Sequence, residues 1–205
     1  MRTLFVTILS IVCWKAAGQC AEKEFVGPSH RFVYLLKLAA DTTHSSQIEQ
    51  DFFCAFPNTV NELTEVFGAD KKTGMLSYNG VHDQLKTIFF FYNLTTIDRS
   101  AYYKKYVDLC SDGEWYNRDD VDGFGLLLKL LTDPSNVVAE LETRTDSDIL
   151  NVFRLLLSCS NEKGLNKKYT EINEVLGTSS PALMAPLYKA FNEIRTARPW
   201  ETGQN

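Results

Sequence analysis

Residues 45–68 read SSQIEQDFFCAFPNTVNELTEVFG and contain two short helical patterns separated by a proline. Ser45 is a residue type that caps a helix N-terminus, and Pro57 ends the first pattern because proline cannot continue a helix. The second pattern repeats the same spacing. The stretch therefore predicts two consecutive amphipathic helices. Apolar residues of the first pattern that recur at three- and four-residue spacing are Ile48, Phe52 and Phe53.

The same helical spacing recurs along most of the chain, and strand-like alternation is almost absent. We expect about eight to ten helices of two to four turns, joined by short loops. Such a run predicts an all-α fold, either a single irregular multi-helix bundle or a short α-solenoid of stacked helix pairs. The other helical patterns cover residues 31–41, 80–92, 98–110, 117–131, 134–144, 145–157, 166–177 and 180–195.

Residue types that start or end helices lie beside several of these patterns. Gly177 is predicted to end one helix, since glycine is common just past a helix C-terminus. Pro186 lies within the second turn of the last pattern, which implies a kink or a later helix start. The predicted N-terminal residues are Asp98, Pro134, Thr145 with Asp148 in a capping box, and Ser180 with Pro181.

The N-terminus resembles an export signal. Arg2 precedes an apolar run over residues 4–14, and small residues occupy 16–18. The run is too short to span a bilayer but has the usual length of a signal-peptide core. We therefore expect a signal peptide over 1–18 that is removed during export to the periplasm or the extracellular space.

The remaining chain is expected to be one helical domain over 19–195 with a frayed tail over 196–205. Cys20 leaves a second interpretation open, in which it becomes the lipidated first residue of a lipoprotein. Gln19 disfavours this, because such sites have a small residue before the cysteine. No segment after the signal predicts a stable membrane anchor.

The expected mature chain is acidic. The full sequence has 21 basic and 26 acidic residues, so loss of Arg2 and Lys15 changes its formal charge from −5 to −7. This balance argues against nucleic acid as a partner, because phosphate binding needs clustered Lys and Arg. It is compatible with a basic protein partner.

Four cysteines remain after signal removal, and two disulfides would be possible in an oxidising compartment. The sequence cannot choose among the three pairings, and a buried, unpaired cysteine is an alternative for each, most clearly for Cys54 in FFCAF. No C-x-x-C motif supports a redox or zinc site. The candidate disulfide cysteines are Cys20, Cys54, Cys110 and Cys159.

The most acidic stretch is LCSDGEWYNRDDVDGFGLLLKLL, residues 109–131. It lacks the ligand order of an EF-hand, so we expect no metal there. Its aspartates are better explained as the first turn of a helix capped by Asn117, where acids interact favourably with free N–H groups. A catalytic carboxylate pair within Asp112–Asp122 remains the alternative.

Aromatic and acidic residues near this stretch are candidates for binding a partner. Trp and Tyr carry much of the energy of protein interfaces, although Trp115 is also typical of a core residue. Tyr102 and Tyr106 share an apolar face, whereas Tyr103 lies off it and is expected to be exposed. The candidate partner-binding residues are Trp115, Tyr116, Asp119, Asp120 and Tyr103.

No catalytic or cofactor motif occurs in the chain. The three histidines are far apart and have no local ligand partners, so neither a metal nor a cofactor is predicted. In residues 80–92, Phe89 is expected on the apolar face with Ile88 and Tyr92. The aromatic run 89–92 would be core, or would line an internal cavity in a carrier of apolar ligands.

Three blocks, FCAFPNTVNELTEVFG (53–68), DGEWYNRDDVDGFG (112–125) and RTDSDILNVFRLLL (144–157), resemble a group of small exported α-helical proteins of Bacteroidota. Val60 and Leu63 replace the usual Phe pair. The resemblance covers roughly residues 45–195 and implies a shared helical fold, with no established activity to transfer. In size and export signal, the group is similar to periplasmic immunity proteins that block toxins.

Together these features predict an exported, non-enzymatic protein-binding domain, such as an immunity or adaptor protein that occludes a toxin or another protein partner. Two alternatives remain. One is an extracytoplasmic hydrolase that uses the Asp112–Asp122 acids, and the other is a secreted helical carrier of an apolar ligand.

Overall fold

The computed structural model describes Cys20 and residues 23–67, 81–111, 126–159 and 161–197. These residues form ten α-helices and one short 3-10 turn, with no strand among them, which confirms the all-α prediction. The helices are α1 (Pro28–Ala39), α2 (Ser46–Ala55), α3 (Val60–Phe67), α4 (Val81–Tyr92), α5 (Arg99–Ser111), α6 (Leu126–Thr132), α7 (Pro134–Leu141), α8 (Asp146–Leu156), α9 (Glu162–Ser179) and α10 (Met184–Ala197), and the 3-10 turn η2 (Pro181–Leu183) precedes α10.

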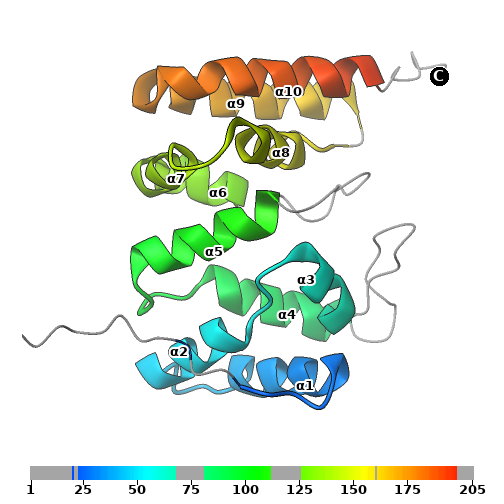
Figure 1. The fold of residues 1–205 in the computed structure, drawn as a ribbon, viewed down its shortest axis with the longest axis vertical. Helices are drawn as coiled ribbons and strands as arrows, with labels where there is room; N and C mark the ends of the chain where they lie inside the picture. Colours follow the sequence, from blue (N-terminus) through cyan, green and yellow to red (C-terminus); the bar gives the residue numbers. More distant parts are fainter. Residues whose placement is uncertain (1–19, 21–22, 68–80, 112–125, 160, 198–205) are drawn as a thin grey trace, which may run out of the picture.

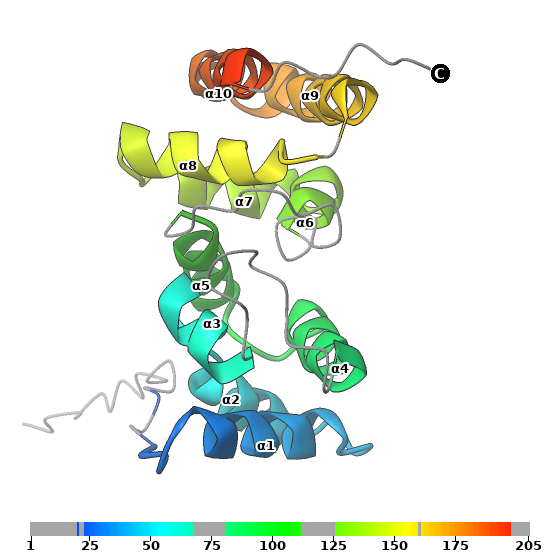
Figure 2. The same cartoon turned by 90° about the vertical axis from the view of Figure 1, so that its right-hand side faces the viewer.

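The helices stack along one long axis, from α1 and α2 at one end to α9 and α10 at the other (Figure 1). At the first end, α1 packs against α2, α3 and α4. In the middle, α5 packs against α7 and α8, and at the far end α10 packs against α8 and α9. The view from the side shows the same layered order (Figure 2). Helices that follow one another in the chain therefore mostly lie in the same or the next layer.

Side-chain caps start several helices where the sequence predicts them. The Ser45 hydroxyl accepts a hydrogen bond from the Ile48 N–H, and the Thr145 hydroxyl accepts one from the Asp148 N–H. Asp98 accepts from the Ala101 N–H at 3.0 Å at the start of α5. Each cap satisfies a backbone donor that the first helical turn leaves without a partner.

Several predicted helix ends are wrong by a few residues. α9 begins at Glu162, capped by Asn161, and continues through Gly177 to Ser179. Gly177 is exposed and has no positive φ, so its helical backbone does not end the helix. The last helix also runs two residues beyond the predicted 195 limit, into the expected tail, and ends at Ala197.

The start of the last helix shows how its two prolines are accommodated. Pro181 is the first residue of η2, and α10 begins only at Met184, so Pro186 lies in its first turn. The later start predicted as one alternative is therefore correct. Ser180 is not a side-chain cap, because its hydroxyl donates to Glu142 Oε1 at 2.6 Å.

The core at the first end of the stack is rich in stacked aromatic rings. Phe56 and Phe91 lie nearly parallel with ring centroids 4.2 Å apart, and Phe52 meets Phe90 edge-on at 4.7 Å. The prediction that Phe89 lies on the buried face is wrong, since 55% of its surface is exposed. Phe91 occupies the buried face of α4 instead.

Candidate functional site

Most of the predicted partner-binding residues lie outside the residues that the structure describes. This applies to Trp115, Tyr116, Asp119 and Asp120, and to the helix start predicted at Asn117. The described residues that precede and follow positions 112–125 are Ser111, which ends α5, and Leu126, which begins α6.

Tyr103 is the one predicted partner-binding residue that the structure describes, and its expected exposure is wrong. Only 4% of its surface is exposed, and its hydroxyl donates to Asp133 Oδ2 at 2.8 Å. Burial and this hydrogen bond raise the pKa of Tyr103. The reason is that α5 lies in the middle of the stack, where helices cover more than one of its faces. Tyr103 therefore has little surface left for a partner.

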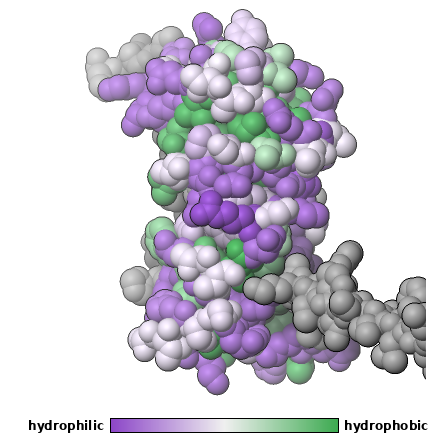
Figure 3. Space-filling view, turned by 90° about the vertical axis from the view of Figure 1, so that its left-hand side faces the viewer, coloured by the Kyte–Doolittle hydropathy of each residue, from purple (hydrophilic) through white to green (hydrophobic). Residues whose placement is uncertain are grey.

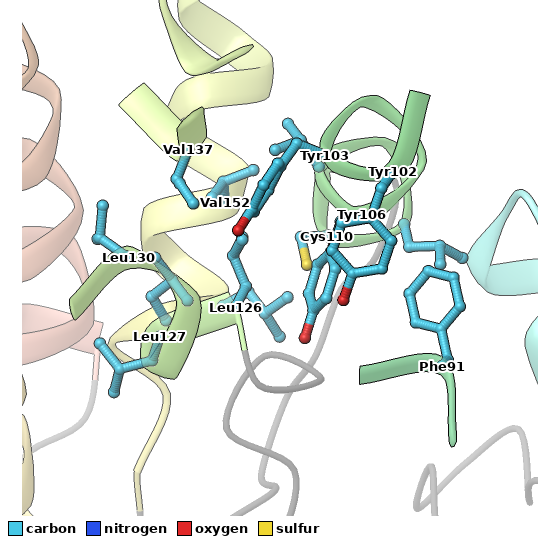
Figure 4. Packing of buried hydrophobic residues seen from close by; sticks show 14 of the residues in the cluster. Phe91, Tyr102, Tyr103, Tyr106, Cys110, Leu126, Leu127, Leu130, Val137 and Val152 are labelled. Atoms are coloured by element: carbon cyan, nitrogen blue, oxygen red, sulfur yellow. The ribbon is translucent and has the colours of Figure 1, made fainter. Parts of the chain in front are cut away.

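Tyrosines of α5 form a buried cluster with a thiol. Figure 4 shows Tyr102, Tyr106 and Cys110 on the same helix, with leucines of α6 on one side and Phe91 on the other. The ring centroids of Tyr102 and Tyr106 are 5.4 Å apart. Burial raises the pKa of both phenols and of the Cys110 thiol. These groups are held neutral, and the expected core role of Tyr102 and Tyr106 is confirmed.

The C-terminal end of α2 binds two basic side chains. Lys105 Nζ donates to the Phe53 carbonyl oxygen at 2.5 Å, and Arg31 Nε donates to the Ala55 carbonyl oxygen at 2.7 Å. Both carbonyls belong to the last turn of the helix, which carries a partial negative charge. Lys105 and Arg31 thus attach α5 and α1 to the same helix end.

Lys105 is an unusually buried cation, with 7% of its surface exposed. Burial and, to a smaller extent, the nearby Arg31 charge lower its pKa to about 7, although Glu62 acts in the opposite direction. Such a lysine could serve as a nucleophile if substrate reached it. Here its amine is bound to a backbone carbonyl within the helix packing, so the arrangement primarily joins α5 to α2.

Glu49 is a buried acid that anchors the connection between α4 and α5. Its carboxylate accepts hydrogen bonds from the backbone N–H and the hydroxyl of both Thr95 and Thr96, at 2.7 to 3.2 Å. Burial raises the pKa of Glu49, but the four hydrogen bonds together outweigh it and leave the pKa below its usual value. The carboxylate therefore remains ionised and fixes this loop against α2.

A second polar network joins α5 to α7. Arg144 follows α7 and forms ion pairs with Asp108 of α5 and Glu140 of α7. It also donates to the Lys104 carbonyl oxygen at 3.2 Å. The Arg144 side chain is 15% exposed, so the pairs are partly shielded from solvent. These groups hold two layers of the stack together.

Cys20 and Cys54 form a disulfide. The interpretation of Cys54 as an unpaired core residue is therefore wrong, because it lies in the last turn of α2 where the N-terminal segment reaches it. Cys110 and Cys159 are buried thiols outside this disulfide. Of the candidate cysteines, the structure thus pairs two and buries the other two.

Two of the exposed large apolar side chains among the described residues belong to α6 and α4. Leu128 of α6 is 61% exposed, and Phe89 of α4 is 55% exposed. Figure 2 shows α4 and α6 on the same side of the stack. On the face that Figure 3 turns towards the viewer, the left-hand side of Figure 1, hydrophilic side chains dominate, and hydrophobic ones gather towards the end with α9 and α10. The side with α4 and α6 is the candidate partner-binding surface.

Within the described residues, no three His, Cys, Asp or Glu side chains are grouped in a way that would hold a metal ion. None of the helices described has the length and apolarity needed to cross a bilayer. Comparison of the chain with protein-family models, curated proteins and solved structures finds no match.

Proposed function

We propose that this chain is an exported protein-binding domain that acts by occlusion, in the manner of an immunity or adaptor protein, without catalysing a reaction. The observation that carries the proposal is the pair of exposed side chains Phe89 and Leu128 on helices at one side of the stack. Aromatic side chains such as Phe89 are enriched at protein interfaces. Trp115 and Tyr116, two further predicted partner-binding residues, lie outside the described part of the chain.

The use of the polar groups in the scaffold also supports a binding role. Lys105 binds a backbone carbonyl, Glu49 binds two threonines, and Tyr103 binds Asp133. Each of these groups has a shifted pKa, and such groups are common in active sites. Their hydrogen bonds here connect helices to other helices or to the loops between them, so packing explains these pKa shifts.

Charge supports a basic partner. The mature chain expected after signal removal has 19 basic and 26 acidic residues, so long-range attraction would steer a basic protein towards it. Occlusion requires only a complementary surface and no reacting group. The Cys20–Cys54 disulfide fits the oxidising compartment that the signal sequence predicts.

Site-specific photocrosslinking tests this proposal. A benzophenone amino acid replaces Leu128 or Phe89 in the exported chain, and Tyr188 serves as a matched control because it is 57% exposed on α10 at the far end of the stack. We expect one discrete protein adduct from the first two positions, suppressed by excess unlabelled chain, and none from the control. Equal labelling from all three positions would contradict a specific surface.

A further inference from the structure

The Cys20–Cys54 disulfide attaches an N-terminal strap, defined as Cys20 and residues 23–27, to the last turn of α2. Cys20 is exposed, so a small thiol can approach its sulfur, whereas Cys54 is partly buried. Exposed disulfides are the reactive ones, since reduction begins with attack of a thiolate on an accessible sulfur. Access alone, however, does not distinguish a reactive disulfide from an ordinary structural one.

The non-covalent contacts of the strap are with α1 and the edge of the core: Phe25 is partly buried and its ring centroid lies 5.9 Å from Arg31 Cζ, and the Gly27 carbonyl accepts from the Arg31 N–H at 3.2 Å. Lys23 Nζ lies 3.5 Å from the centroid of the Tyr34 ring, and the ring centroids of Phe25 and Tyr34 are 5.6 Å apart. The core between α1 and α2 is formed by other residues, among them Leu35 and Phe52, which are fully buried. The strap can therefore detach while the helices beneath it remain packed.

The surroundings of Cys54 favour its departure as a thiolate. Gln50 Nε2 donates a hydrogen bond to the Cys54 sulfur at 3.2 Å. The carbonyls of the two residues that flank Cys54 bind Lys105 and Arg31. A helix C-terminus by itself disfavours an anion, but the Arg31 cation offsets the negative end of the helix and the Gln50 amide stabilises charge on sulfur.

We propose that the Cys20–Cys54 disulfide is a redox-active latch that holds the N-terminal strap on α1 and α2, and that a dithiol reductant opens it without unfolding the helical stack. The reductant thiolate attacks the Cys20 sulfur, the S–S bond breaks, and Cys54 leaves as a thiolate that takes up a proton. The second thiol of the reductant then attacks the mixed disulfide and releases Cys20. The dithiol is oxidised to its disulfide, and the two cysteines gain two electrons and two protons. This inference is independent of the proposed protein-binding role.

The first test treats the folded, oxidised chain with dithiothreitol, followed by iodoacetamide and peptide mass analysis. We expect Cys20 and Cys54 to be alkylated while Cys110 and Cys159, both buried, remain unmodified and the helical circular dichroism is retained. Trypsin should then cleave after Lys23 at least about tenfold faster than in the oxidised chain, because cleavage requires a locally released segment. Alkylation of all four cysteines with loss of helicity would identify a structural staple and overturn the proposal.

Two glutamines of α2 provide a matched pair for the leaving-group argument. Gln50 donates to the Cys54 sulfur, whereas Gln47 donates to Asp51 at 2.8 Å on the exposed surface. Gln50→Met should slow reduction by at least about threefold, since a poorer leaving thiolate departs more slowly, and Gln47→Met should leave the rate unchanged. Equal rates in both variants would refute the role of Gln50.

A permanently open variant keeps the proposal testable if Gln50→Met does not fold. Cys20→Ser removes the attacked sulfur and leaves the rest of the chain intact. We expect this variant to retain its helical signal and to be cleaved after Lys23 as fast as the reduced wild type. A variant that is as resistant as the oxidised chain would show that the disulfide does not hold the strap, and an unfolded variant would show that it is needed for the fold.

Discussion

We expect the free energy of unfolding of the wild type to increase as the pH rises above about 7. Replacement of Lys105 by Met should remove this increase. In the folded chain, burial and the neighbouring Arg31 lower the pKa of Lys105 to about 7, compared with 10.5 for an ordinary lysine. Between these values the unfolded chain binds more protons than the folded chain. The free energy of unfolding therefore increases as pH rises through this window.

The size of this effect follows from the two pKa values. From about pH 7 to about pH 8.5, the increase for one group is roughly 1–2 kcal/mol, because one proton difference changes stability by about 1.4 kcal/mol per pH unit. The window ends at about pH 8.5 to limit the contribution of Cys110. Burial raises the pKa of this thiol in the folded chain, so stability falls at higher pH, where an ordinary thiol ionises in the unfolded chain. The buried tyrosines with raised pKa values act at still higher pH.

The assay is urea unfolding of the oxidised chain, followed by far-UV circular dichroism across this pH range. Lys104→Met is the control, since Lys104 is the exposed neighbour of Lys105 and pairs with Asp108 at the surface. We expect the pH-dependent rise in wild type and in the control, and a flat profile in Lys105→Met. A flat wild-type profile, or the same rise in Lys105→Met, would refute the buried ionisable state of this lysine.

Three further outcomes are expected. Glu49→Gln should lower the free energy of unfolding by roughly 2–3 kcal/mol near neutral pH, because four hydrogen bonds to a carboxylate are weakened. Since the folded pKa of Glu49 is lowered, the wild-type advantage should disappear as pH falls through that pKa, and persistence of the advantage in acid would contradict its charge-based origin. Asn161→Ala should cost about 1 kcal/mol through loss of the cap on the Gly164 N–H, and Asn166→Ala, at an exposed site within the same helix, should cost clearly less in the same urea assay. N-terminal sequencing of the exported chain should begin near Gln19 or Cys20, and recovery of Met1 would remove the signal-peptide prediction.

Local signals in the sequence predict the helical fold well. The caps at Ser45 and Thr145 depend on contacts within three residues, so a short stretch contains all the information needed. The sequence pattern predicts the wrong exposure for Phe89 and Tyr103, because aromatic runs such as FFFY and YYKKY allow more than one helix face to be buried. Which face is covered depends on helices distant in the chain.

The polar groups that connect the helices were not predicted, although the sequence holds a signal for two of them. Glu49 lies three and four residues before Phe52 and Phe53, which places its side chain beside a buried face. Lys105 lies three residues after Tyr102 and four before Leu109, in the same relation to buried residues. Their partners are 46 to 52 residues away, and only the tertiary arrangement brings them together.

The Cys20–Cys54 pairing is likewise beyond local sequence reasoning. The two cysteines are 34 residues apart, and three pairings of four cysteines are equally compatible with the sequence. The structure pairs the cysteine expected to be buried alone with the one that would otherwise be a lipidation site. Because both modifications require the same Cys20 sulfur, the disulfide and lipidation exclude each other.

The most direct test of the proposed function compares the wild type with the double variant Asp119→Asn/Asp120→Asn. The measurement combines a broad hydrolase panel with association kinetics against the partner captured by crosslinking, at low and at high salt. We predict no turnover by either chain, and slower association of the double variant that approaches the wild-type rate as salt increases, because surface charges mainly steer the encounter. Turnover by the wild type that falls at least about 100-fold in the double variant would contradict the binding role and identify a hydrolase with catalytic aspartates.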